Sequence, residues 1–226
     1  MAKVVLTLGD LASIENAARG GPAKGAVRIA LEAVARAGCV NTQMYLVHQC
    51  MMGTALAPPV PLALDFVRAA YEQGDALAAQ ALAQIHDSDW TFANEELTRS
   101  SLREVDRQAA ERYFAEAMRR FVVAAESGDA RSMWYLAVAH YGGGPGMDPD
   151  ADRHHEWAVK AYEAGHVFAA NDLIGPFADP HSPHFDLDRA RECFAALERA
   201  GARVIGHTEL EAWWEREGRG SPPISR

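Results

Sequence analysis

Cysteine is scarce in this chain, which has three thiols, Cys39, Cys50 and Cys193, among its 226 residues. An odd number of cysteines without regular spacing does not form a disulfide framework, so we expect reduced and mostly buried thiols. Each thiol lies in an apolar helical pattern, and the sequence contains no nucleophile-elbow motif. The cysteines therefore give no indication of nucleophilic catalysis.

Long hydrophobic segments are also missing from the start of the chain. The first ten residues, MAKVVLTLGD, contain one short apolar run that ends at Gly9. This run is too short for the core of a signal peptide and far too short to span a bilayer. We therefore expect a cytoplasmic protein that does not insert into a membrane.

Positive charge is in deficit, with 22 Lys and Arg against 31 Asp and Glu, and the net charge is −9. Basic clusters stay short, as at Arg119 and Arg120, and no pattern of stacking aromatics accompanies them. The resulting field repels phosphate backbones, so we expect no nucleic-acid partner. The same field favours a basic protein partner.

The glycine cluster GGGPG at residues 142–146 lacks the Lys-Ser/Thr that follows a phosphate-binding loop. It also follows a helical pattern instead of a strand, so its amides would not form a ready anion site. We interpret it as a linker whose turn is stiffened by Pro145 and Pro149.

An internal repeat is present instead, because five segments share an alanine-rich amphipathic run, a glycine and a second run. The five glycines are Gly38, Gly74, Gly128, Gly165 and Gly201. They are 36, 54, 37 and 36 residues apart, which is the length of a two-helix repeat with one insertion of 18 residues. Each glycine suits the left-handed position after a helix, and Asp75 and Asp129 can cap the helix that follows.

The insertion precedes the third repeat, where apolar residues recur every three or four positions. This spacing predicts one long helix from about Ser101 to Ser127, with Ser101 and Glu104 as a capping box. The residues before it place Trp90 and Phe92 near its start. The long helix would extend beyond the neighbouring repeats. The insertion at residues 88–107 either packs on this extension or serves as a partner-binding tip, and we leave both possibilities open.

The stretch GMDPDADRHHEWAVKAYEAGHVFAANDL resembles the Sel1-like repeat, a tetratricopeptide-related unit with the pattern AAxxGxxxAxxxL and a YxxGxGVxxDxxKA linker. The resemblance extends over about residues 24–205. It implies an all-α fold, a right-handed α/α solenoid of about five two-helix repeats with one extended helix. The first helices of the repeats would line the concave face.

The domain organisation follows from the repeat boundaries. We expect an N-terminal cap at residues 1–23, the repeat solenoid at 24–205, a C-terminal capping helix at 206–217 and a disordered tail at 218–226. The repeats are expected near residues 26–53, 62–89, 101–143, 150–177 and 186–217.

Two groups of histidines raise the question of metal binding. One loop contains nitrogen and oxygen ligands together, namely Asp179, His181, His184 and Asp186. The alternative is that this loop is only the next linker between repeats. In the second group, His154 and His155 point about 100° apart on a helix, so we expect His154 to pack against the preceding repeat.

The resemblance implies a non-catalytic protein-interaction module of a bacterial cytoplasm, an adaptor, scaffold or regulator, with no cofactor. Its partner would lie against the concave face of the solenoid. The helical wheel points five side chains there, nine residues before a repeat glycine or, for the lysine, five. They are Asp65, Arg119, Glu156, Lys160 and Glu192.

Three other functions stay open at this stage. An acidic repeat protein could neutralise a toxin as its immunity partner. Some cysteine-rich relatives are associated with β-lactam hydrolysis, so a metal-dependent or β-lactam-acting enzyme is the rival class, although this chain lacks their paired cysteines. A homodimer could form through the long helix or through Trp213 and Trp214.

Overall fold

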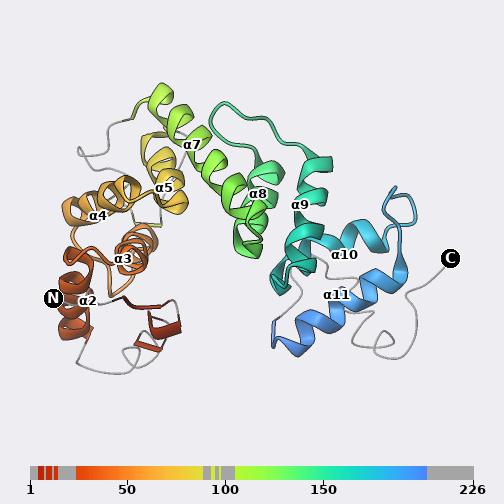
Figure 1. Cartoon of the computed structure of the whole chain (residues 1–226), viewed down its shortest axis with the longest axis horizontal. Helices are drawn as coiled ribbons and strands as arrows, with labels where there is room; N and C mark the ends of the chain where they lie inside the picture. Colours follow the sequence, from red (N-terminus) through yellow and green to blue (C-terminus); the bar gives the residue numbers. More distant parts are fainter. Residues whose placement is uncertain are drawn as a thin grey trace. The chain divides into compact units, whose positions relative to one another are not determined.

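Helices form the regular structure of the chain (Figure 1). The computed structural model describes residues 5–7, 9–11, 13–14, 24–88, 93–94, 97 and 105–202. Within these residues there is no β-strand, and the β-type pairing is one isolated bridge between Gly144 and Met147. The all-α class predicted from the sequence is therefore confirmed.

The helices follow one another in pairs that match the repeats. The first helices are α2 (Lys24–Arg36), α4 (Val60–Glu72), α7 (Arg107–Glu126) and α9 (Ala151–Glu163). The second helices are α3 (Val40–Met52), α5 (Ala76–His86), α8 (Ala130–Gly142) and α10 (Ala170–Ala178), the last preceded by the 3-10 turn η1 (Val167–Ala169). Helix α11 (Leu187–Arg199), which precedes Gly201, is a fifth first helix and packs against α10.

The repeat glycines end the first helices as the sequence predicts. All five have positive φ, between 68° and 98°. At Gly74, Gly128 and Gly165 a Cβ would meet no atom within 4 Å, so the left-handed backbone itself is what requires glycine. The predicted caps are confirmed, because Asp75 accepts the Ala78 N–H at 2.7 Å and Asp129 accepts the Ser132 N–H at 2.9 Å.

The long helix is confirmed, but its predicted start is wrong. Helix α7 has 20 residues and begins at Arg107, whereas the sequence predicted a start at about Ser101. Residues 105 and 106 are not helical, and the Asp106 carboxylate accepts the N–H groups of Gln108 and Ala109 at 2.9 and 3.2 Å. Asp106 thus caps the helix locally, a role that the apolar spacing does not reveal. The capping-box residues at 101 and 104 lie outside the described residues.

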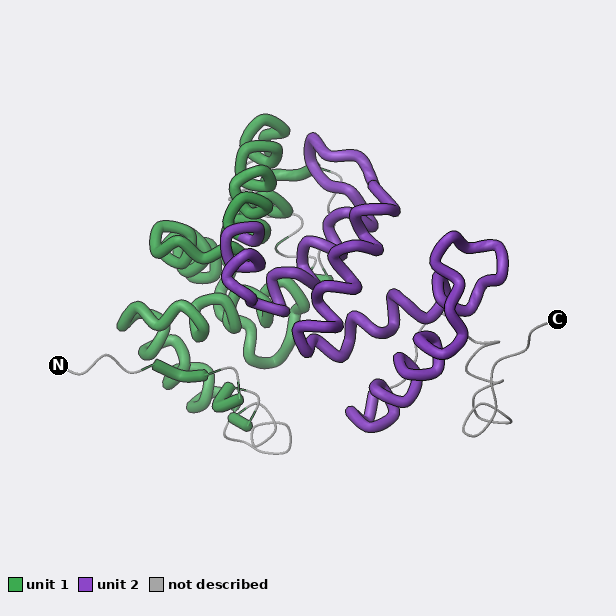
Figure 2. The backbone as a smooth tube through the Cα atoms, turned by 45° about the vertical axis from the view of Figure 1, so that its right-hand side comes forward, with its two compact units in different colours: residues 1–120 green, residues 121–226 purple. Residues whose placement is uncertain are grey.

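The chain divides into two compact units, residues 1–120 and residues 121–226 (Figure 2). In unit 1, α2 to α5 and the first part of α7 enclose one apolar core. Leu46 and Leu82, which stand eight residues after their glycines, are 0% and 3% exposed within it. Leu11 also joins this core and is 1% exposed.

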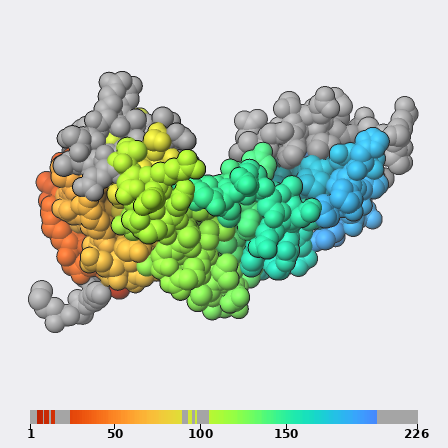
Figure 3. Space-filling view, turned by 90° about the horizontal axis from the view of Figure 1, so that it is seen from above, coloured from red at the N-terminus to blue at the C-terminus, as the bar shows by residue number. Residues whose placement is uncertain are grey.

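Unit 2 has its own core, formed by α8, α9, α10 and α11. Ala158, Leu173 and Phe194 are among its most buried members. The connection at residues 143–150 lies on the surface seen from above (Figure 3). Within it, Gly143 has a φ of 69°, and a Cβ there would lie 2.7 Å from the Met147 carbonyl oxygen.

The predicted repeat boundaries stay predictions, and several terminal features fall outside the described residues. These are most of the N-terminal cap at 1–23, the helix at 206–217, the tail at 218–226, and Trp90, Phe92, Trp213 and Trp214. Among the residues that are described, no helix is both long enough and apolar enough to cross a membrane.

Candidate functional site

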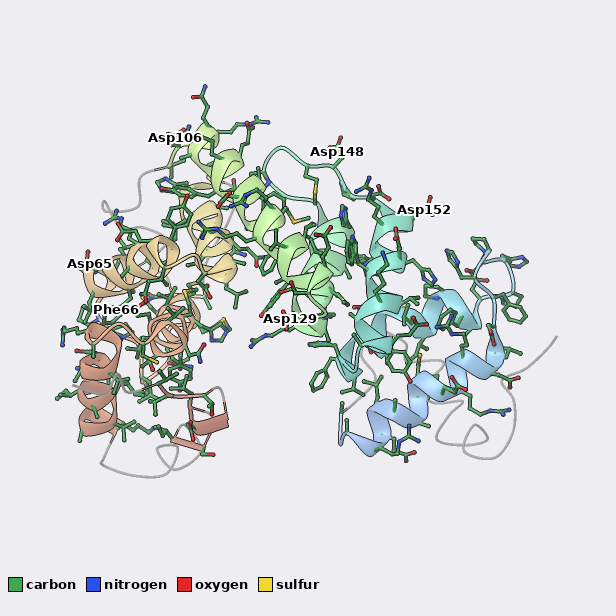
Figure 4. All side chains as sticks on the ribbon, in the orientation of Figure 1. Asp65, Phe66, Asp106, Asp129, Asp148 and Asp152 are labelled. Atoms are coloured by element: carbon green, nitrogen blue, oxygen red, sulfur yellow. The ribbon has the colours of Figure 1, made fainter. Side chains whose placement is uncertain are left out.

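The side chains predicted to bind a partner are all exposed on first helices. They are Asp65 on α4, Arg119 on α7, Glu156 and Lys160 on α9, and Glu192 on α11. In unit 1, α4 and α7 are joined by Arg120, which reaches the Tyr71 carbonyl. Figure 4 labels Asp65, which also lies on α4. In unit 2, α9 and α11 are joined by an ion pair of 3.1 Å between Glu163 and Arg189. Within each unit, the candidates therefore lie on neighbouring helices.

Arg119 is occupied by a carboxylate of its own helix. Its Nε and Nη2 donate to the two oxygens of Glu116 at 2.8 and 2.7 Å. Arg120 also donates to Glu116, at 2.7 Å. The hydrogen bond from Arg119, followed by that from Arg120, lowers the pKa of Glu116 to about 2. A partner's carboxylate would thus have to compete with Glu116 for Arg119.

On α9, Lys160 and Glu156 neutralise each other. The Lys160 Nζ donates to Glu156 Oε1 at 2.6 Å and lies 4.4 Å from the centroid of the Trp157 ring. The hydrogen bond from Lys160 lowers the pKa of Glu156. Both side chains are well exposed, at 45% and 59%, so the pair is accessible but carries no net charge.

The remaining two candidates are free carboxylates. Among the described residues, neither Asp65 nor Glu192 has a hydrogen-bond or ion-pair partner. Both are exposed and point away from the apolar cores. They are therefore the candidate groups that could meet a cationic side chain without first giving up another contact.

Negative charge is concentrated in unit 2. Residues 121–202 contain 13 Asp and Glu but six Lys and Arg. On α9 and α11 the carboxylates recur at helical spacing and form what we call the acidic face. It consists of Asp152, Glu156, Glu163, Asp188 and Glu192. The neighbouring bases are already paired, Lys160 with Glu156, Arg189 with Glu163 and Arg191 with Asp188.

Sequence reasoning missed the structural role of Arg120. Its Nη1 donates to the carbonyl oxygens of Tyr71 at 3.1 Å and of Asp75 at 2.9 Å. Its guanidinium also lies 4.4 Å from the centroid of the Tyr71 ring. The spacing of four residues indicates the pair with Glu116, but nothing in the spacing indicates contacts with the α4–α5 turn.

Three of the four candidate metal ligands, Asp179, His184 and Asp186, have another role. Asp179 accepts the His181 N–H at 2.9 Å, and Asp186 caps α11 by accepting the N–H groups of Asp188 and Arg189. The His184 ring stacks on His155. In the described part of the chain, no group of three or more His, Cys, Asp or Glu side chains is placed to hold a metal ion.

The stacked pair of His155 and His184 was not predicted. Their ring centroids are 3.6 Å apart, and Phe177 meets His155 edge-on at 5.6 Å. Burial, followed by the nearness of His184, lowers the pKa of His155 to about 4. The inward side of α9 is marked by the buried Ala158, three residues further on, and this spacing could have identified His155 as a packing residue.

His154 packs against the preceding repeat, as predicted. Its Nδ1 lies 2.9 Å from the Ala137 carbonyl oxygen on α8, and its ring contacts Tyr141 at 5.1 Å. The three cysteines are free and buried, which confirms the expectation of buried thiols. Burial raises the pKa of Cys193 to about 12, so its thiolate is disfavoured.

Comparison with known proteins identifies the fold. No protein-family model and no curated protein matches the chain. Among solved structures, a Sel1 repeat protein from Oxalobacter formigenes aligns with a TM-score of 0.56 and 18% identity, over 89% of this chain and 74% of that one. The chain has the fold of a Sel1 repeat protein.

A second solved structure with this fold also aligns. It is a protective antigen present in uropathogenic Escherichia coli strains, with a TM-score of 0.40, 17% identity, and coverage of 85% of this chain and 45% of that one. The Sel1 repeat fold accounts for the helix pairs and the glycine turns described above.

Proposed function

We propose that this protein is a non-catalytic protein-binding module, an adaptor or regulator, whose first helices contact the partner. Support comes from the fold, because stacked helix pairs present extended surfaces without requiring a catalytic cleft. Further support comes from the five exposed candidate side chains, which share these helices. The partner contributes a segment that lies across first helices of neighbouring repeats.

The negative charge of the acidic face implies that the partner segment is basic. This face combines five carboxylates from α9 and α11, of which Glu156, Glu163 and Asp188 are paired with cations. Among the described residues, Asp152 and Glu192 have no such partner, so the face keeps a negative charge. A concentration of one charge attracts the opposite charge and speeds association. The observation that carries the proposal is Glu192, an exposed carboxylate of this face that has no hydrogen-bond or ion-pair partner among the described residues. Asp65 provides the same feature in unit 1.

Charge reversal tests the proposal. Tagged wild-type protein is used to isolate its partner from the native cell, and the amount captured by each variant is measured by quantitative mass spectrometry. We expect Glu192→Lys and Asp65→Lys to lower capture roughly tenfold, because each turns an attraction into a repulsion. The matched control is Asp179→Lys, an exposed reversal in the loop between α10 and α11, away from the first helices. The proposal fails if the control lowers capture as much as the two test variants do.

A further inference from the structure

A second surface of unit 2 differs in kind from the acidic face. Trp134, Val138 and Tyr141 recur on α8 with spacings of four and three, so they share one side of the helix. Tyr141 is 73% exposed and Val138 is 39% exposed, while Trp134 is half-buried. Phe168, which is 56% exposed, joins them through His166, whose ring stacks on Trp134 at 4.9 Å. We call these four residues and His166 the α8 face.

The repeat fold does not require apolar residues at these positions. Counted from the repeat glycine, Trp134, Val138 and Tyr141 stand six, ten and thirteen residues on. In α5 and the residue after it, the same positions carry polar side chains, namely Gln80, Gln84 and Asp87. In α3 the same positions carry Met44, His48 and Met51, and both methionines are partly buried against the core of unit 1. What sets α8 apart is that Val138 and Tyr141 are exposed instead of packed. A contiguous exposed apolar surface is typical of an interaction site.

The charges around the α8 face indicate its occupant. Asp129 precedes the first residue of α8, and Asp148 lies in the connection beyond the last; Figure 4 shows the two at opposite ends of this helix. Both carboxylates are exposed, and Asp129 keeps its charge while it caps α8 through the Ser132 N–H. The arginine of α8, Arg131, lies over the Tyr135 ring with its Cζ 5.6 Å from the centroid. The face is therefore an apolar strip with a carboxylate beyond each end.

We propose that the α8 face binds an amphipathic helix of another protein, with an apolar centre and lysine or arginine at both ends. The apolar strip spans about two helical turns, which suits anchors at i, i+3, i+4 and i+7. The basic ends would meet Asp129 and Asp148, and the rings of Trp134 and Tyr141 would also attract cations. A second copy of this acidic unit would instead be repelled.

A designed peptide tests the proposal on the full-length protein. The probe is a synthetic amphipathic helix of about 18 residues, with leucines at its centre and two lysines at each end. A second peptide carries glutamates in place of the lysines. Calorimetry at low salt should give a Kd roughly tenfold lower for the lysine peptide. The proposal is wrong if the glutamate peptide binds equally well or if neither peptide binds.

Two variants locate the site. Val138→Gln combined with Tyr141→Gln gives α8 polar positions like those of α5, and should weaken binding of the lysine peptide roughly tenfold. The matched control is Val123→Gln, which changes a valine of α7 that is 55% exposed. Equal weakening by the control would overturn the assignment.

A charge variant covers the case in which the double variant does not fold. Asp148→Asn removes one end charge on an exposed loop and should reduce the salt dependence of binding, whereas Asp179→Asn should not. An unchanged salt dependence in Asp148→Asn would contradict the proposal.

Sedimentation of wild-type protein tests whether a second copy of this chain occupies the face. If wild-type protein forms a dimer that the double variant abolishes, a second copy is the occupant and the proposal is wrong. Since no residue here belongs to the acidic face, this inference and the proposed function can fail separately.

Discussion

Arg120 and Arg119 are adjacent, bind the same carboxylate, and should differ sharply in their contribution to stability. Arg120 donates to two backbone carbonyls of the α4–α5 turn, lies over the Tyr71 ring, and its side chain is 16% exposed. Arg119 contacts Glu116 alone among the described residues through hydrogen bonds, and its side chain is 65% exposed. Replacing each by alanine separates the backbone contacts from the ion pair.

The magnitude follows from the contacts of Arg120. Two hydrogen bonds from a charged donor contribute about 1.5 kcal/mol each, and the cation–π contact adds about 1 kcal/mol. Water can reach the freed carbonyls in part, which lowers the expected loss for Arg120→Ala to about 2–3 kcal/mol. In a chain of this length that corresponds to a drop in Tm of about 5–10 °C. For Arg119→Ala we expect a change within about 0.5 kcal/mol, as for other exposed pairs.

Urea and thermal unfolding followed by circular dichroism measure both variants against wild type. Arg120→Lys adds a third point, because an ammonium keeps the charge but cannot reproduce the planar fork, and should recover about half of the loss. Equal destabilisation by Arg119→Ala and Arg120→Ala would refute the reasoning, since the ion pair with Glu116 would then explain the effect of both.

Three further predictions concern unit 2. His155 has a pKa of about 4 in the folded protein and about 6.5 when unfolded, so the stability that depends on its neutral ring is complete above pH 6.5 and falls as the pH drops from 6.5 to 4. Because the ring is partly exposed and solvent screens the effect, we expect a loss of about 1–2 kcal/mol. His155→Phe should flatten this slope in pH-dependent unfolding. Gly143→Ala should cost about 2 kcal/mol in urea unfolding, because its Cβ would clash with the Met147 carbonyl, whereas Gly142→Ala, with nothing within 4 Å, should not. Asp186→Ala should cost about 1 kcal/mol through loss of the α11 cap, measured the same way, and a loss near zero would argue against that cap.

The helices could be predicted because their signals are local. A glycine in the left-handed conformation and an aspartate cap act within a few residues, so the spacing of Gly74 and Gly128 marks the turns directly. The start of α7 was predicted wrongly because a local cap overrides the apolar pattern there. Apolar spacing continues upstream of the helix, and it says nothing of the cap that Asp106 provides. In the folded chain the cap at Asp106 decides where the helix begins, and the periodic pattern does not.

The candidate site was predicted less completely, because surface charges depend on contacts between elements. Sequence identified which side chains would be exposed, since helical phase fixes direction. It did not show that Arg119 is held by Glu116 while Glu192 has no such partner among the described residues. The stack of His155 on His184 joins a helix to a loop about 30 residues further on, and no spacing rule predicts such a contact.

Hydrogen exchange of the complex with the captured native partner tests the central claim most directly. If the first helices contact the partner, peptides from α9 and α11 should gain protection on binding, and those from α4 should gain it when unit 1 takes part. Protection confined to the second helices α3, α5 and α10, with none on α4, α9 or α11, would contradict the account.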